Sequence, residues 1–196
     1  MLLKASPPRW MVVFLGNPGT KFELTRHNAG WLACSCLEEK LKVKTNKLKF
    51  HAFTTICELG GERVLLMRPQ TYMNLSGDAA APAAQFYKIP VDHIIVVHDD
   101  TALAPGRLRI KRGGSDGGHN GIKSLTQRLG SSDYPRVKIG VGSPTHPDYD
   151  MIDWVIGRPS EAELKVIAEA AGRAAAAVEE IIKSGIDSAM NKFNGS

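Results

Sequence analysis

The chain has 196 residues, of which 43% are hydrophobic and 23% are charged. This length and composition are typical of one soluble globular domain, residues 1–196, and they exclude collagenous and disordered chains. The first apolar run, residues 10–15, is too short to span a membrane and lacks the cleavage pattern of a signal peptide. Three cysteines are too few for a disulfide framework, so we expect a reduced, cytoplasmic protein.

The net charge of +5 is unevenly distributed along the chain. Residues 1–146 carry 20 Lys and Arg against 11 Asp and Glu, whereas residues 147–196 carry 5 against 9. The basic residues form two clusters, which are Lys40, Lys42, Lys44, Lys47 and Lys49, and Arg107, Arg109, Lys111 and Arg112. Such clusters suit a polyanionic partner. For the first cluster, a lysine-rich loop that only faces solvent is an equally good interpretation.

The first predicted elements are a buried strand, a helix and a hairpin. The continuous apolar residues 10–16 predict a buried strand that ends at a turn over residues 17–19, and the apolar spacing in residues 30–41 predicts a helix. Residues 50–59 and 64–67 are rich in β-forming types and are separated by two glycines, which predicts a hairpin.

The middle of the chain predicts a helix followed by two strands. Residues 76–87 are alanine-rich and predict a helix, which Pro82 should disturb or kink. Residues 93–98 form the strongest buried-strand pattern and are followed by Asp99 and Asp100. Residues 107–111 alternate basic and apolar types, so their basic side chains should face solvent or a ligand.

The last third predicts further helices and one strand. A helix is predicted over residues 122–129, a strand over 137–141, and a short helix over 187–193. Residues 160–183 begin with a capping-box pattern and continue with a helical apolar stripe. Strands that alternate with helices, together with one hairpin, predict an α/β fold with a mixed sheet surrounded by helices.

Polar residues follow several of the predicted strands. Ligands of open α/β sheets bind at the carboxyl ends of strands, so these residues are candidates for a common site. They are one histidine, one carboxylate and three amides, namely His27, Asp99, Asn17, Asn74 and Asn120. The histidine can take a proton from water, the carboxylate can fix its tautomer, and the amides can hold a carbonyl and the water. Each residue alone is more typical of a loop or turn than of a catalyst.

Other chemistries find little support in the chain. The glycine-rich residues 113–121 match neither dinucleotide nor P-loop fingerprints. His93 and His98 should point to opposite faces of one strand, so they cannot chelate a metal together. A hydrolase that uses no metal and no nucleotide cofactor is the interpretation that remains.

Five motifs occur in order along nearly the whole chain. They are Gly16-Asn17-Pro18-Gly19, Thr25-Arg26-His27-Asn28-Ala29-Gly30, Pro69-Gln70-Thr71-Tyr72-Met73-Asn74-Leu75-Ser76-Gly77, His98-Asp99-Asp100 and Gly117-Gly118-His119-Asn120-Gly121. Together they closely resemble the bacterial-type peptidyl-tRNA hydrolase family. The resemblance implies a monomeric α/β fold. It also implies hydrolysis of the ester between a peptide and the 3′-terminal ribose of tRNA, which returns tRNA from stalled translation.

The resemblance also implies roles for individual residues. His27 matches the general base and Asp99 the acid that keeps it basic. Asn74 and Asn120 match amides that hold water and substrate, and Asn17 matches the residue that favours N-blocked substrates. The positions that match substrate contacts are Phe22, Tyr72, Met73, Gly118 and His119.

For the phosphates of the acceptor stem and the 3′ CCA end, the candidates are Lys111 and, more weakly, Arg112, Arg136 and Lys138. Two positions depart from the family pattern. Phe22 stands where tyrosine is usual, which removes a hydroxyl contact, and Asp100 replaces a common glutamate.

Two other functions are compatible with the residues. One is a non-catalytic RNA-binding protein on the same scaffold, although every proposed catalytic position holds the required residue type. The other is an esterase for a different acylated RNA or a small ester, which the basic character of residues 1–146 disfavours for uncharged small substrates.

Overall fold

A mixed sheet forms the centre of the protein, whose computed structural model describes residues 6–146 and 148–195. In this part of the chain the sheet has seven strands in the order β2-β3-β4-β1-β5-β7-β6. The strands are β1 (Trp10–Phe14), β2 (Lys47–Lys49), β3 (Ala52–Leu59), β4 (Glu62–Pro69), β5 (Ile94–Asp100), β6 (Leu108–Lys111) and β7 (Arg136–Gly140).

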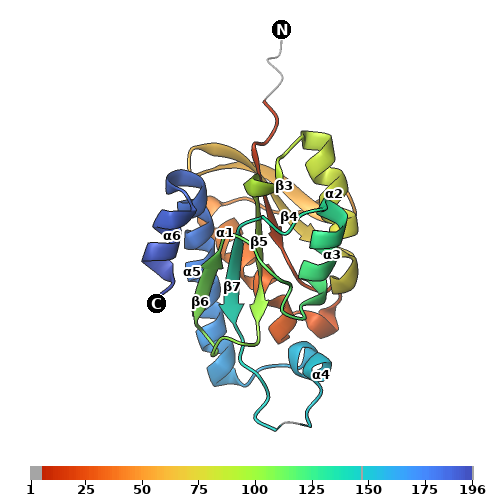
Figure 1. Ribbon diagram of the computed structural model, residues 1–196, viewed down its shortest axis with the longest axis vertical. Coiled ribbons are helices and arrows are strands. Elements are labelled where there is room, and N and C mark those ends of the chain that lie inside the picture. Colours follow the sequence, from red (N-terminus) through yellow and green to blue (C-terminus); the bar gives the residue numbers. More distant parts are fainter. Residues whose placement is uncertain (1–5, 147, 196) are drawn as a thin grey trace.

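The four inner strands β4, β1, β5 and β7 are parallel, whereas β2, β3 and β6 complete the two edges by antiparallel pairing. The predicted mixed sheet is therefore confirmed, and so is the predicted hairpin, which β3 and β4 form. The carboxyl ends of the parallel strands share one edge of the sheet, and in Figure 1 the arrows of β5 and β7 point toward it.

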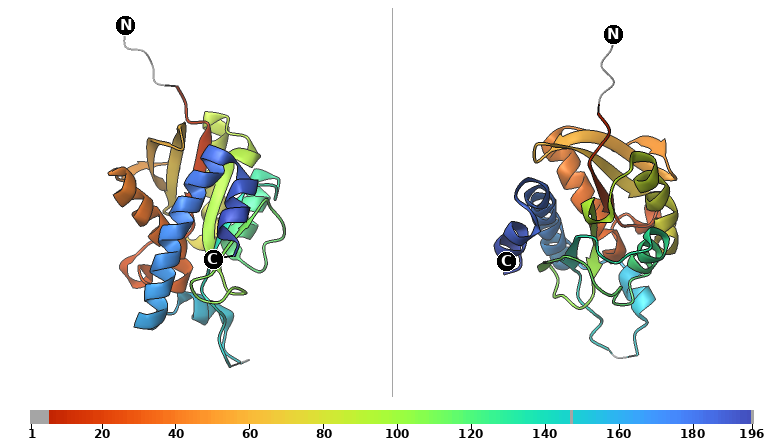
Figure 2. Two further views of the ribbon diagram at one scale, coloured as in Figure 1. Left: turned by 90° about the vertical axis from the view of Figure 1, so that its left-hand side faces the viewer. Right: turned by 45° about the horizontal axis from the view of Figure 1, so that its top comes forward.

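The described part of the chain has six α-helices around the sheet. They are α1 (Ala29–Leu41), α2 (Ser76–Tyr87), α3 (Asn120–Leu129), α4 (Met151–Ile156), α5 (Glu161–Ser184) and α6 (Ile186–Phe193). Helix α4 lies beyond the carboxyl edge of the strands (Figure 1). Figures 1 and 2 show α5 and α6 on one side of the sheet and α2 and α3 on the other. No helix among the described residues is long and apolar enough to cross a membrane.

The continuous apolar run of β1 reflects this covering of both faces. Val12 and Phe14 pack in the core under α1 and α5, whereas Met11 and Val13 pack in the core under α2 and α3. Side chains of a strand alternate between faces, so a strand covered on both sides must be apolar at every position.

Pro82 was expected to disturb or kink the helix over residues 76–87, but it does not interrupt α2, which continues through this residue. Pro82 is exposed, so the carbonyl that loses its helical partner, that of Asp78, lies toward the solvent side of the helix. Buried alanines hold the opposite face of α2 against the sheet. The capping box of α5 is present as predicted, since Ser160 and Glu163 bond each other's backbone amides.

Among the strands and α-helices of the described chain, β2 and α4 were not predicted. Strand β2 consists of exposed Lys47, Leu48 and Lys49 at an edge of the sheet. The first lysine cluster therefore extends into an edge strand, where charged side chains oppose edge-to-edge association.

Gly30 places the start of α1 against the sheet. A Cβ atom at this position would lie 2.5 Å from the carbonyl oxygen of Leu15 and 2.6 Å from that of Val97. Only a glycine permits this approach. The residues just before α1 are thereby held at the carboxyl ends of β1 and β5.

Candidate active site

His27 and Asp99 meet at the carboxyl edge of the sheet. His27 belongs to a short 3-10 helix, Arg26–Asn28, that leads into α1, and Asp99 is the penultimate residue of β5. The His27 Nδ1 atom lies 2.9 Å from each carboxylate oxygen of Asp99. Both residues are buried, with exposed fractions of 8% and 1%. An ionised carboxylate only accepts hydrogen bonds, so His27 carries its proton on Nδ1 and keeps a lone pair on Nε2.

A second histidine, His119, contacts the same carboxylate. His119 is the N-cap of α3, and its Nδ1 accepts hydrogen bonds from the backbone amides of Gly121 and Ile122. Its Nε2 lies 2.9 Å from Asp99 Oδ1. Asp99 therefore faces two imidazoles, whose ring centroids are 4.9 Å apart.

These contacts determine the charges of the pair. Burial alone would raise the pKa of Asp99, but the neighbouring His27 and His119 hold this pKa well below its usual range. Burial alone would lower the pKa of His27, but the charge and hydrogen bond of Asp99 raise it above the usual value of 6.5. Asp99 is thus a carboxylate, and His27 is a stronger base than a free histidine.

His98, which belongs to the quoted motif His98-Asp99-Asp100 but was assigned no role, lies beside these residues. Its Nδ1 donates to the backbone carbonyl of Asp99 at 2.7 Å, and its Nε2 has no partner within the described chain. Complete burial and the nearby His119 keep the pKa of His98 well below 6.5. His98 is therefore a neutral imidazole in the wall of the site.

Asn17 links three segments of the site. Its Oδ1 accepts a hydrogen bond from the Met73 backbone amide at 2.8 Å. Its own backbone is held by the Asn28 side chain, which accepts from Asn17 N and donates to Asn17 O. Because Oδ1 is engaged, the Nδ2 group is the part of the Asn17 amide that remains to donate. Sequence reasoning missed Asn28, although it follows His27 directly in the quoted motif.

The other predicted amides lie at the surface beside this cluster. Asn74, in a short helix after β4, and Asn120, the first residue of α3, are both exposed. A Cβ atom at Gly121 would lie 2.6 Å from Met73 Sδ, so the segments that carry the two amides pack together. Tyr72 is 59% exposed.

A pocket of about 340 Å³ opens over the two contacting histidines. Its polar wall includes His27, Asp99, His119 and Asn120, and Gly118 also lines it. Helix α4 contributes Met151, Ile152 and Val155, an apolar wall that was not predicted. A base beside a mixed polar and apolar pocket is suited to the hydrolysis of a polar bond that is attached to an apolar group.

The pocket also holds the one group of possible metal ligands found among residues 6–146 and 148–195. The ligand atoms of His27, Asp99 and His119 lie within 4.8 Å of one another. However, His119 Nδ1 accepts two backbone amides, so the proton of the neutral ring lies on Nε2, which then has no lone pair to offer a metal. Hydrogen bonding accounts for this cluster.

Comparison with known proteins agrees with the site. A family model described as peptidyl-tRNA hydrolase matches residues 11–196. The peptidyl-tRNA hydrolase of Caldanaerobacter subterraneus subsp. tengcongensis is 48% identical over 186 residues, covering 95% of this chain and 100% of the relative. This chain belongs to the peptidyl-tRNA hydrolase family. It is thereby assigned to a class of enzymes, which favours a catalyst over the non-catalytic RNA-binding alternative.

Other members of the family agree with this assignment. The peptidyl-tRNA hydrolase of an Exiguobacterium species is 44% identical and covers 93% of this chain and 98% of its own. The crystal structure of peptidyl-tRNA hydrolase from Acinetobacter baumannii superposes with a TM-score of 0.89 at 31% identity and covers 97% of both chains. The fold predicted from the resemblance is thus confirmed.

The basic residues expected to bind phosphate differ in accessibility. The expectation for Arg136 is contradicted, because this residue is 1% exposed and its guanidinium donates to the carbonyls of Gly114 and Ser115 at 2.6 and 2.7 Å. Arg136 instead holds the glycine-rich segment in place. Lys138 is half-buried in the pocket wall and pairs with Asp100, one of the two residues that depart from the family pattern.

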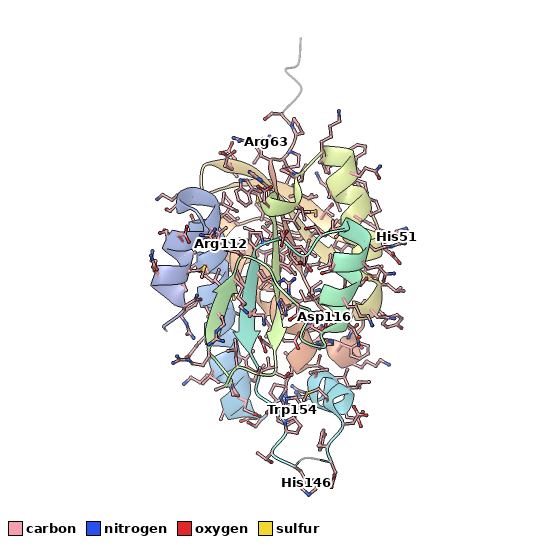
Figure 3. All side chains as sticks on the ribbon, viewed as in Figure 1. His51, Arg63, Arg112, Asp116, His146 and Trp154 are labelled. Atoms are coloured by element: carbon pink, nitrogen blue, oxygen red, sulfur yellow. The ribbon has the colours of Figure 1, made fainter. Side chains whose placement is uncertain are left out.

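The exposed cations lie along β6. Arg109 and Lys111 point outward from this strand, as its alternating sequence predicted, and Arg109 lies opposite Lys138 in the sheet. Figure 3 shows Arg112 at the far end of β6 from Asp116 and Trp154, which lie toward the pocket and α4. Arg112 is exposed and pairs with Asp187. Arg109, which was not among the predicted site residues, lies between Lys111 and the pocket.

Proposed function

We propose that this protein hydrolyses the ester that joins a peptide to the 3′-terminal ribose of tRNA, with His27 as the general base. The observation that supports this most is the pair of 2.9 Å contacts between His27 Nδ1 and the Asp99 carboxylate. They leave the Nε2 lone pair of a buried, basic imidazole at the pocket. An esterase without a covalent nucleophile needs such a base to activate water.

The reaction follows from these groups. His27 Nε2 takes a proton from a water molecule, whose oxygen attacks the ester carbonyl and forms a tetrahedral intermediate. The imidazolium then gives this proton to the ribose 3′ oxygen as the ester bond breaks, so peptide carboxylic acid and tRNA leave. Asp99 stabilises the imidazolium, and Asn74 and Asn120 hold the water and the carbonyl by hydrogen bonds.

Asn17 is proposed to select substrates whose amino group is blocked. Its Oδ1 accepts from Met73 N, which leaves the Nδ2 group of Asn17 to donate to substrate. A donor pairs well with the carbonyl of an N-acyl group and poorly with a free ammonium, which also donates. Free aminoacyl-tRNA is therefore a poor substrate.

The exposed face of β6 is proposed to bind tRNA phosphates, with Lys111 as the main contact and Arg112 and half-buried Lys138 as weaker ones. Tyr72, Met73, Phe22 and Gly118 are proposed to contact the terminal nucleotide and peptide. The protein is further proposed to act as a monomer in ribosome rescue. A cytoplasmic location is proposed because its three cysteines are free thiols, which is typical of a reduced compartment.

Lys111→Ala is expected to raise KM for peptidyl-tRNA about 10-fold at low salt while kcat stays near the wild-type value, because one charge-assisted contact is lost. The salt dependence of kcat/KM should flatten by about one unit of logarithmic slope. Steady-state kinetics at several salt concentrations measure both effects, with exposed Lys165→Ala on α5 as the matched control. An unchanged KM at low and high salt would show that Lys111 does not contact the phosphates of tRNA.

The general-base role of His27 predicts a pH profile. The unprotonated imidazole is the active form, and Asp99 raises the pKa of His27 above 6.5. We therefore expect kcat/KM to fall on the acid side with an apparent pKa above 6.5, about tenfold for each pH unit below it. Initial rates with subsaturating N-acetylaminoacyl-tRNA measure the profile, and a flat rate between about pH 5 and 8 contradicts the role.

A further inference from the structure

His119 occupies the junction between the catalytic carboxylate and the start of α3. Its Nδ1 accepts the backbone amides of Gly121 and Ile122 at 3.1 and 3.4 Å, and its Nε2 lies 2.9 Å from Asp99 Oδ1. A ring nitrogen that accepts a hydrogen bond carries no proton in the neutral imidazole. The single proton therefore lies on Nε2, and the Nε2–H group of His119 donates a hydrogen bond to Asp99.

The backbone around His119 leaves this ring little freedom. Its own amide donates to the Asp116 carbonyl at 3.1 Å, and the Gly118 amide donates to the Asp116 carboxylate at 2.8 Å. The His119 side chain is 9% exposed and packs against the rings of His27 and His98. The next residue is Asn120, so the hydrogen bonds from the Gly121 and Ile122 amides to His119 also fix the backbone on either side of Asn120.

We propose that His119 is a positioning residue of the hydrolysis, which fixes the Asp99 carboxylate for His27 and joins this pair to the start of α3. This inference rests on the proposed function of His27 and Asp99. His119 acts through Asp99 and does not need to touch substrate. Its hydrogen bond also weakens the interaction of the Asp99 charge with His27, because both imidazoles contact Asp99 Oδ1.

The surroundings allow a specific test of this sharing. The other titratable groups at the pocket are His98 and Asp100 on β5, Lys138 on β7 and Asp116 before α3. His98 is neutral, Lys138 is paired with Asp100, and Asp116 is exposed to solvent and accepts from the Gly118 amide. These groups therefore add little to the charge that His27 meets. If the hydrogen bond from His119 is removed, the negative charge of Asp99 acts on His27 alone. The pKa of His27 should then rise.

Two substitutions separate the donor from the helix cap. In His119→Asn the side-chain oxygen can replace Nδ1 at the cap, but no donor reaches Asp99. In His119→Gln the amide nitrogen can reach Asp99, but the cap is lost. We expect His119→Asn to lower kcat at least about 10-fold and to change KM less than about twofold. The apparent pKa of the acid limb, the fall of kcat/KM toward low pH, should rise by about half a unit. His119→Gln should keep the wild-type acid limb.

The measurement is the pH dependence of kcat and KM on N-acetylaminoacyl-tRNA, with folding checked by circular dichroism. His93→Asn, which removes a histidine at the amino end of β5, is the matched control. His119→Ser, another good N-cap, takes the place of His119→Asn if the latter does not fold.

A wild-type acid limb and kcat in His119→Asn would overturn the inference, as would equal shifts in the asparagine and glutamine variants. A raised KM with unchanged kcat would also overturn it, because it would make His119 a substrate contact. Wild-type enzyme and His27→Ala are measured in the same assay. Absent turnover by the first or normal turnover by the second refutes the proposed function instead.

Discussion

His27→Ala is expected to lower kcat for N-acetylaminoacyl-tRNA by at least about 10²-fold, or roughly 2.7 kcal/mol of activation free energy. The variant removes the nitrogen that takes the proton from water, and no other described side chain can replace it. His98 in the pocket wall has an Nε2 without a partner among the described residues, but it is fully buried and its pKa is held low. Asp99 is too weak a base, since its pKa lies well below the usual range.

The first control for His27→Ala is a check that the variant still folds. His27 is 8% exposed, so circular dichroism and thermal unfolding must show that the core is intact. His93→Ala at the other end of β5 controls for loss of an imidazole as such. A folded His27→Ala enzyme with near-normal turnover removes His27 from the mechanism.

Asp99→Asn is expected to lower kcat by about 10² to 10³-fold while the protein stays folded. Two N–H donors face this side chain, and an asparagine offers one acceptor oxygen in place of two. One histidine then meets an NH₂ group and turns away or changes tautomer. The variant also has no charge to stabilise the His27 imidazolium, so the acid limb of kcat/KM should move to lower pH.

Initial rates across the pH range measure both effects for Asp99→Asn. The direction of the pH shift separates this variant from His119→Asn, for which the limb should move to higher pH. An Asp99→Asn enzyme with an unchanged acid limb would show that Asp99 does not set the basicity of His27.

The fold could be predicted where the sequence pattern is local. The apolar runs of β1 and β5 and the capping box of α5 each contain their own signal, and each lies where it was expected. Strand β2 has three exposed residues and no alternating apolar pattern, so its pairing with β3 alone defines it. Helix α4 has six residues and is held by Arg26, which stacks on Trp154 at 3.7 Å.

The site could be predicted as a set of residue types but not as a network. His27 and Asp99 were singled out because histidine and carboxylate follow predicted strands, and the motifs paired them. The burial of Arg136 and the second donor to Asp99 depend on contacts between segments about 20 residues apart, which no local pattern contains. The same holds for Asn28, whose partner lies 11 residues earlier.

The central claim is that a His27–Asp99 base cleaves the ester of N-blocked aminoacyl-tRNA. The most direct test follows release of labelled N-acetylaminoacyl groups from tRNA, with unblocked aminoacyl-tRNA in parallel and a metal chelator present throughout. The account predicts rapid cleavage of the blocked substrate and slow cleavage of the unblocked one. Binding of tRNA without cleavage, or cleavage that the chelator abolishes, would contradict it.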